Sequence, residues 1–346
     1  MLAGMPPTPR AMILAAGLGT RLGSLTSLLP KPMLPLCGTP LVRWVVLWLH
    51  SQGIREIVIN LHHLGEQIEA ELGDGSELEV SIAYSREAPE ILGTGGGVRK
   101  ARSLLDDGSG APIVIVNGKI LLDLDLRPVL DQHRATGAEA TMVLRRDPRA
   151  ERWGSLRLND QGEVVGFLGL ERAGARLGEP LMFTGVQVID PRFIDRIPEQ
   201  GASCIVRTAY RQLFDSGRGY YGYVTDAYWW EHSNLERYLA GLHHVLDGRA
   251  ELAYAARPLR GIDASAKIHR TASLREPLWI GRGVEVGEGA VVGPYVELGD
   301  RVIVDKNVHV SELIACRGAH LRSSAESAVA VGEELVRGET GVKSSV

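Results

Sequence analysis

A glycine-rich loop and two basic side chains near the N-terminus form a combination suited to binding phosphate. A short apolar run continues directly into Leu14-Ala-Ala-Gly-Leu-Gly-Thr-Arg-Leu22. Gly17 and Gly19 let the backbone approach a phosphate closely, and successive N–H groups can form a concave anion site. Arg21 lies at the end of the loop, and Lys31 stands between two prolines that restrict the backbone around it. The pattern predicts a site for the phosphates of a nucleotide.

The run GLGTRL followed by PKPMLP resembles the signature of the sugar-1-phosphate nucleotidyltransferases, also called NDP-sugar pyrophosphorylases. The resemblance implies transfer of a nucleoside monophosphate from an NTP to a sugar-1-phosphate, giving NDP-sugar and pyrophosphate. It also implies that Arg21 faces the β- and γ-phosphates and that Lys31 neutralises charge at the reacting phosphoryl group. The loop residues expected to bind the nucleotide are Leu14, Ala15, Ala16, Gly17, Gly19, Thr20 and Arg21.

A second glycine-rich segment, Glu90-Ile-Leu-Gly-Thr-Gly-Gly-Gly97, resembles the family's E-P-L-G-T-A-G segment, which lies against the base and ribose. The carboxylate of Glu90 can accept the N1–H and 2-amino donors of guanine, as the mannose-1-phosphate guanylyltransferases would require. The three consecutive glycines are more similar to the N-acetylmuramate-1-phosphate uridylyltransferases, so GTP and UTP are both expected. The alternative is that Glu90 is a solvated residue before a helix. The nucleotide-binding residues expected from this half are Glu90, Gly93, Gly95, Gly96 and Asn117.

The positions that hold Mg²⁺ in the family are altered. Phosphoryl transfer depends mostly on positioning and charge stabilisation, and a divalent ion normally supplies much of that charge. The resemblance implies two aspartates, in V-N-G-D and W-x-D-I-G-T-P motifs. Here the first motif ends in Lys119 and the second places Glu231 at the aspartate position. A protonated lysine has no lone pair to give a metal.

Three interpretations of Lys119 are open. Its ammonium replaces part of the metal's charge, or it forms a salt bridge with Glu231 in an inactive site, or Mg²⁺ binds elsewhere with Asp123 or Asp125 as ligand. Asp125 also fits an N-cap before a helix over 126–135, and we favour that role. The expected catalytic residues are Arg21, Lys31, Lys119 and Glu231, and Mg²⁺ is expected to arrive with the NTP.

Two further glycines are expected at the sugar. Trp153-Gly154-Ser155 resembles the family's Y-G-V, and the segment over 183–188 resembles its T-G-I-Y-V strand, which implies sugar-facing glycines at Gly154 and Gly185. The family's E-E-K-P motif, whose lysine binds the sugar phosphate, is absent. Gly169 and Leu170 stand in its place.

The elements that position these residues alternate between strand and helix. Short apolar runs predict strands over 12–16, 57–61, 78–84 and 112–116. Amphipathic stretches predict helices over 41–52, 65–72 and 97–105, with Thr39 as N-cap and Pro40 at the first helical position. The order implies an α/β fold with a Rossmann-like, doubly wound, mostly parallel sheet that binds its ligand at the carboxyl ends of the strands.

The C-terminal part has a different period. An aliphatic residue recurs every six positions from Ile262 to Val310, which gives nine hexads in register. Such hexapeptide repeats predict a left-handed β-helix of about three coils, similar to the C-terminal module of guanylyltransferases, and favour a homo-oligomer. The expected domains are a flexible 1–10, a nucleotidyltransferase domain over 11–250, the β-helix over 251–322 and a flexible tail over 323–346.

Composition narrows the function classes. A formal charge of −4 gives no basic field for nucleic acid, and no apolar run approaches the roughly 20 residues that span a membrane. Cys37, Cys204 and Cys316 are few and widely spaced, which predicts neither a disulfide framework nor a zinc site and favours a cytoplasmic protein. The alternative to an active enzyme is an impaired homologue that binds a nucleotide-sugar and regulates a partner.

Overall fold

The computed structural model describes residues 7–337, which form two compact units. The first unit contains the chain up to Gly17 together with Val45–Trp229. The second contains Leu18–Trp44 and the chain from Trp230 onwards. The units therefore do not follow the expected boundary near residue 250, because the segment with Arg21 and Lys31 packs with the C-terminal part.

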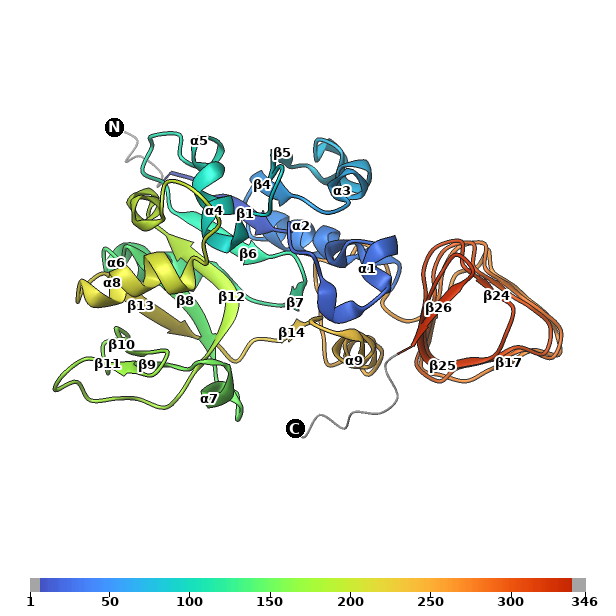
Figure 1. The fold of residues 1–346 in the computed structure, drawn as a ribbon. Helices are drawn as coiled ribbons and strands as arrows, with labels where there is room; N and C mark the ends of the chain where they lie inside the picture. The colour runs from blue at the N-terminus through green and yellow to red at the C-terminus, as the bar shows by residue number, and fades with distance from the viewer. Residues whose placement is uncertain (1–6, 338–346) are drawn as a thin grey trace, which may run out of the picture. The chain divides into compact units, whose positions relative to one another are not determined.

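The first unit is built on a seven-stranded sheet in the order β13-β8-β12-β6-β1-β4-β5 (Figure 1). The strands are β1 (Arg10–Leu14), β4 (Glu56–Leu61), β5 (Ser81–Arg86), β6 (Ile113–Asn117), β8 (Ala140–Arg145), β12 (Met182–Ile189) and β13 (Tyr220–Val224). Neighbouring strands run parallel except β12, which is antiparallel to both β6 and β8. The predicted mostly parallel sheet is confirmed.

Helices and short strands surround this sheet. The helices are α2 (Leu41–Ser51, in this unit from Val45), α3 (Gly65–Leu72), η3 (Ser76–Leu78), α4 (Gly93–Lys100), α5 (Arg102–Leu105), α6 (Arg127–Ala135), α7 (Ala150–Trp153), η4 (Pro191–Arg196), the π-helix η5 (Val206–Tyr210) and α8 (Arg211–Asp215). The short strands are β7 (Ile120–Leu122), β9 (Leu156–Leu158), β10 (Val164–Phe167) and β11 (Leu170–Glu171). Within residues 7–337, no helix has the length and apolar character needed to cross a membrane.

Two helix predictions differ from the structure. The helix expected over 97–105 begins at Gly93 and is split into α4 and α5 at Ala101. Glycine is a poor helix former, so the sequence alone gave no sign of helix over 93–96. Thr39 and Pro40 do not start α2 but form the short strand β3 (Thr39–Pro40), which pairs with β2 (Pro35–Leu36).

The second unit contains a β-helix whose repeat is the predicted one. Its first strands are β15 (Gly261–Ile262), β16 (Lys267–Ile268), β17 (Ser273–Leu274), β18 (Leu278–Ile280), β19 (Glu285–Val286), β20 (Val291–Val292), β21 (Val296–Leu298) and β22 (Ile303–Val304). Ile262 pairs in parallel with Ile280, and Ile280 with Leu298, so each coil takes three hexads. Figure 1 shows the coils stacked as a triangle, and the hexapeptide-repeat β-helix is confirmed.

The β-helix continues beyond the expected end at 322. The last regular hexad lies in β23 (His309–Ala315). After it, β24 (His320–Leu321) and β25 (Ala325–Val331) add further rungs, and β26 (Glu334–Arg337) pairs with β25. Val296 pairs with Leu313 and Val310 with Ala325, intervals of 17 and 15 residues instead of 18, which hid these rungs from the repeat. The expected flexible tail is wrong for 325–337, and residues 338–346, like 1–6, lie outside the described residues.

The rest of the second unit lies before and between these elements. It comprises η1 (Thr20–Leu22), α1 (Leu25–Leu28), η2 (Lys31–Met33), β2, β3, β14 (Trp229–Glu231, from its second residue) and α9 (Leu235–Leu246). Asn234 caps α9, since its side-chain oxygen accepts the Arg237 N–H at 2.9 Å.

Candidate active site

In the first unit, the carboxyl ends of three neighbouring strands lie level with one another. Leu14 pairs with Asn60 of β4 on one side and with Asn117 of β6 on the other. The turn after Asn117 contacts the end of β1, because the Gly118 N–H donates to the Leu14 carbonyl at 3.0 Å. This is the sheet edge at which the fold class binds its ligand, and it brings together the predicted residues Leu14 and Asn117.

A buried relay that the sequence analysis missed joins the first loop to the second glycine segment. The Ala15 N–H donates to Asn60 Oδ1 at 2.7 Å, and Asn60 Nδ2 donates to Glu87 Oε1 at 2.7 Å. The other carboxylate oxygen of Glu87 accepts the Leu92 N–H at 2.6 Å. Asn60 and Glu87 are both buried. In the sequence, Asn60 lies at the end of a predicted strand and Glu87 precedes Ala-Pro, but their spacing does not indicate that the two side chains meet.

The second glycine segment is packed against residues 201–203 of the same unit. An added Cβ on Gly93 would lie 2.7 Å from the Ser203 carbonyl oxygen, and one on Gly96 would lie 2.9 Å from that of Gly201. The Gly95 N–H donates to Ser203 O at 2.8 Å. These glycines are therefore required by the approach of residues 201–203. Glu90, the expected base reader, is exposed to solvent.

The relay leads to a testable expectation. Replacing Glu87 by glutamine is expected to reduce the free energy of unfolding by about 1–3 kcal/mol, because an amide nitrogen would then face one of two buried donors. Urea unfolding measures the loss, and the KM for NTP should rise with it because both loops are held by this carboxylate. Glu90→Gln is the matched control and should stay within about 0.5 kcal/mol of wild type. Equal stability of Glu87→Gln and wild type would contradict the relay.

Asn117 and the sugar-facing candidate Gly185 are brought together. Gly185 lies at φ +84°, and an added Cβ there would collide with the Asn117 side-chain amide. The strand register of β12 shifts between Phe183 and Gln187, which places Gly185 in an irregularity. The Trp229 indole N–H donates to the neighbouring Thr184 carbonyl at 2.7 Å. Glycine at 185 is thus needed for the close approach of Asn117.

The candidate metal ligand Asp125 is bound by a neighbouring arginine. Asp125 accepts both the Arg127 backbone N–H at 3.0 Å and its guanidinium at 2.8 Å, and that hydrogen bond holds the pKa of the Asp125 carboxyl below its usual value. The Asp123 N–H donates to Tyr228 O at 2.9 Å. Lys119 is half-buried in the turn between β6 and β7. Across residues 7–337 no group of three or more His, Cys, Asp or Glu side chains could hold a metal ion. Lys119 stands in place of the first family aspartate, so one of the two carboxylates of the family's Mg²⁺ site is missing.

The second unit holds the two predicted cations of the nucleotide site. Lys31 is 6% exposed and its Nζ donates to the Ser233 carbonyl at 2.8 Å, in the segment just after the predicted residue Glu231. Gly19 has φ +69°, and an added Cβ would lie 2.7 Å from Thr26 Cγ2. Arg21 and Thr20 are exposed on η1, and in the first unit Gly17 is exposed too. Lys31 is therefore a fixed cation, whereas Arg21 stands on an accessible loop.

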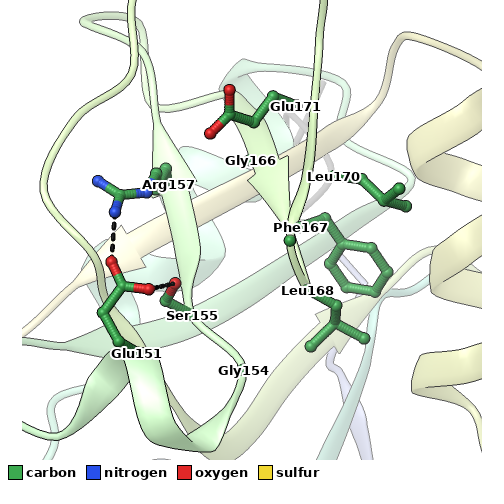
Figure 2. A pocket seen from close by; sticks show the side chains of 10 residues that line it. Glu151, Gly154, Ser155, Arg157, Gly166, Phe167, Leu168, Leu170 and Glu171 are labelled. Carbon is green, nitrogen blue, oxygen red and sulfur yellow. Dashed lines mark hydrogen bonds and ion pairs between the residues drawn. The ribbon is translucent and has the colours of Figure 1, made fainter.

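A cavity of about 370 Å³ in the first unit contains the second sugar candidate, Gly154 (Figure 2). Gly154 lies at φ +85°, and an added Cβ would be 2.6 Å from Leu168 Cδ2. Figure 2 shows Arg157 paired with Glu151 at one side of this cavity, and the Arg157 guanidinium also donates to Gly178 O at 2.9 Å. The cavity is lined by Glu151, Gly154, Ser155, Arg157, Gly166, Phe167, Leu168, Gly169, Leu170 and Glu171. Arg157 is a cation that the sequence analysis overlooked.

Comparison with known proteins agrees with this geometry. A family profile described as nucleotidyl transferase matches residues 10–231. The chain is similar to a mannose-1-phosphate guanylyltransferase of Mycobacterium tuberculosis, 32% identical over 85% of this chain and 79% of that protein. It is also similar to an N-acetylmuramate alpha-1-phosphate uridylyltransferase of Neisseria meningitidis, 39% identical over 51% of this chain and 78% of that protein.

A solved structure shows the same fold. The crystal structure of HddC from Yersinia pseudotuberculosis aligns with a TM-score of 0.54 and 23% identity, over 67% of this chain and 97% of that one. At this identity the likeness concerns the fold alone.

Proposed function

The chain belongs to the nucleotidyl transferase family, and we propose that it transfers a nucleoside monophosphate from GTP or UTP to a sugar-1-phosphate with Lys119 at the family's metal position. The observation that carries the proposal is Lys31. Its ammonium is buried and held by the Ser233 carbonyl, while the glycine loop ahead of it stays exposed. Burying an ammonium costs free energy. A cation held in place beside an accessible phosphate loop can stabilise charge that develops during the reaction, which is the role we propose for Lys31.

The reaction is an in-line displacement at the α-phosphorus. An oxygen of the sugar phosphate attacks that phosphorus, and the bond to the oxygen that bridges the α- and β-phosphates breaks. The electron pair leaves with that oxygen, so the products are NDP-sugar and pyrophosphate. Arg21 would bind the β- and γ-phosphates, and Lys31 would offset the charge that develops at the reacting group.

We assign the sugar side to the first unit. Gly185 and Asn117 lie together at the sheet edge, and the cavity that contains Gly154 is large enough for a sugar phosphate. The family's lysine is missing there, and Arg157 supports the proposal because it places a guanidinium at the cavity wall. Its pairing with Glu151 orients the guanidinium and leaves room for a second anionic partner.

The identity of the base is divided between two candidates. Glu90 is exposed and can accept the donors of guanine, and the relative matched over most of the chain is a guanylyltransferase by name. The relative with 39% identity is a uridylyltransferase by name. Glu90→Gln should lower turnover with GTP and leave turnover with UTP unchanged if Glu90 reads guanine.

A second candidate function follows from the altered metal motif. With Lys119 where the family has an aspartate, the chain could bind a nucleotide-sugar and regulate a partner without turnover. A pyrophosphate-release screen of GTP, UTP, ATP and CTP against hexose-1-phosphates, with and without Mg²⁺, separates the two. Pyrophosphate and NDP-sugar in equal amounts support the enzyme. Nucleotide-sugar binding by calorimetry without any release supports the regulator.

We also propose that the chain self-associates through its β-helix. Ile262 on the first rung is 48% exposed and Ile303 is 40% exposed, and the first rung leaves an open backbone edge. The double substitution Ile262→Lys with Ile303→Lys is expected to weaken association at least tenfold, since burying one isoleucine contributes about 1.5–3 kcal/mol. Light scattering against concentration measures it.

Leu104→Lys is the control for this prediction. Leu104 is 39% exposed and belongs to the first unit, not to the β-helix. The control should keep the mass of wild type. If the double variant also keeps the mass of wild type, the β-helix does not mediate self-association.

A further inference from the structure

One outer face of the β-helix is covered and contains a buried carboxylate. Val296 and Leu298 point into the interior of the coil, so Glu297 between them points outward. Trp279 pairs with Glu297 in register, and Glu297 pairs with Ile314. These three outward residues are 5%, 0% and 0% exposed.

A second outer face of the β-helix serves for comparison, because its outward residues are exposed. There the in-register outward residues are Lys267, Glu285 and Ile303. Lys267 and Glu285 form an ion pair at 2.7 Å on the surface, and Ile303 is 40% exposed. The difference in exposure indicates that the face with Glu297 packs against another part of this unit.

The element over Glu297 is the hairpin of β2 and β3. Its turn consists of Cys37 at φ 49° and Gly38 at φ +70°, the left-handed pair that two-residue hairpins favour. The Cys37 N–H donates to Glu297 Oε2 at 2.7 Å, and the Gly38 N–H donates to Oε1 at 2.8 Å. Successive N–H groups in this conformation form an anion site, and here the anion is the protein's own carboxylate. A Cβ on Gly38 would collide with the Trp279 ring.

This hairpin directly follows the segment that carries Lys31. The Leu41 N–H donates to Leu34 O at 3.0 Å, and the Trp44 indole donates to Leu36 O at 3.1 Å. The Tyr238 hydroxyl donates to the Pro35 carbonyl. Five residues lie between Lys31 and Cys37. Glu297 provides a charged anchor for the far end of that short segment.

We propose that Glu297 is a positioning residue for nucleotidyl transfer: its carboxylate fixes the Cys37–Gly38 turn and, through it, the place of the Lys31 ammonium. The β-helix is then part of the catalytic apparatus. The inference rests on the proposed function, in which Lys31 acts at the reacting phosphoryl group.

The ionisation of Glu297 should make this positioning role depend on pH. Burial raises its pKa from 4.5 to about 7, and the two backbone N–H groups partly oppose the rise. The ionisable groups around it are Cys37 on the hairpin, Cys316 after β23, Tyr238 on α9 and Arg260, which faces Cys37. Burial raises the pKa values of both thiols and of the phenol, so these three are neutral near pH 7. Glu297 is the member of the cluster that changes charge there.

Activity and stability should respond to this titration in opposite directions. A carboxyl group whose pKa is raised on folding favours the folded state below 4.5, and that stability is lost as the pH rises through about 7. Only the ionised carboxylate, however, offers an acceptor to both N–H groups. Between pH 5 and 8, wild type should therefore lose melting temperature relative to Glu297→Gln while its turnover rises relative to that variant.

The test compares full-length wild type, Glu297→Gln and the control Glu285→Gln. At pH 8 we expect kcat of Glu297→Gln to fall about tenfold, because a small displacement of a reacting group is costly. The acidic limb of the wild-type profile should disappear, and Glu285→Gln should match wild type throughout. Wild-type kcat and an unchanged pH profile in Glu297→Gln would overturn the inference, as would a loss of melting temperature that follows the loss of activity at every pH.

Hydrogen exchange decides the case without the variant and without turnover. In wild type, protection of peptides over 31–40, corrected for intrinsic exchange, should change between pH 8 and pH 6, with an α3 peptide as reference. Unchanged protection would overturn the inference even if Glu297→Gln fails to fold. If wild type makes no product with any substrate, the proposed function fails, and the exchange result still decides whether Glu297 holds the segment.

Discussion

Replacing Lys31 by methionine is expected to lower kcat about 10²–10³-fold, the usual loss on removing one preorganised group that stabilises developing charge. Lys31 is nearly buried, and the Ser233 carbonyl holds its Nζ at 2.8 Å. Methionine keeps the length and volume of the stem and removes only the charge and its hydrogen bonds. Steady-state kinetics with the best substrate pair measure the loss, and circular dichroism verifies that the variant is folded.

The position of Lys31 also predicts how the loss of activity is divided between kcat and KM. Because the ammonium is expected to act on charge that develops during the reaction, kcat should fall more than the KM for NTP rises. Lys306→Met, at an exposed lysine of the β-helix, is the control and should retain wild-type kinetics. A Lys31→Met enzyme with normal kcat would contradict the role given to Lys31.

Replacing Lys119 by aspartate is the second large effect. The substitution rebuilds the family's N-G-D motif and converts a charge of +1 to −1 in the half-buried turn after β6. If the ammonium supplies charge that a metal supplies elsewhere in the family, wild type should turn over with little dependence on Mg²⁺ beyond that carried by the NTP. The variant should then lose this turnover. Titration of free Mg²⁺ at fixed NTP, with pyrophosphate release as readout, measures the change.

The other outcomes for Lys119 are equally informative. If wild type is inactive, Lys119→Asp should gain Mg²⁺-dependent turnover, and the gain should increase with Glu231→Asp, which restores the second family aspartate. Equal activity with the same Mg²⁺ dependence in wild type and variant would make Lys119 a bystander. Asp123→Asn would then be the next variant, since Asp125 is held by Arg127.

The sequence predicted the fold well where a repeat or a buried run was long. Nine hexads established the coil because each aliphatic residue packs on its equivalent one coil later, as Ile262 does with Ile280. The prediction failed where the interval changed, and β25 was mistaken for tail. The helical start at Gly93 was also missed, because it depends on the approach of Ser203, more than a hundred residues away in the chain.

The sequence indicated candidate site residues but not the residues that support them. Arg21 and Lys31 were predicted from residue type and spacing, because a glycine-rich loop and a lysine between prolines resemble the family signature. Glu87 and Glu297 gave no such signal. Each is an ordinary glutamate in sequence, and only the fold buries it against two hydrogen-bond donors. For Glu87 these are the Asn60 side-chain amide and the Leu92 N–H, and for Glu297 they are two backbone N–H groups of the hairpin turn.

The measurement that most directly tests the central proposal follows the phosphorus atoms of a labelled NTP. Wild type is mixed with a sugar-1-phosphate and with GTP or UTP labelled at either the α- or the γ-phosphate, and the products are separated. We expect α-label to appear in the NDP-sugar and γ-label in pyrophosphate, at equal rates, and Lys31→Met to slow both together. Label found only in free nucleotide or orthophosphate, or no transfer to any sugar-1-phosphate, would contradict the proposal.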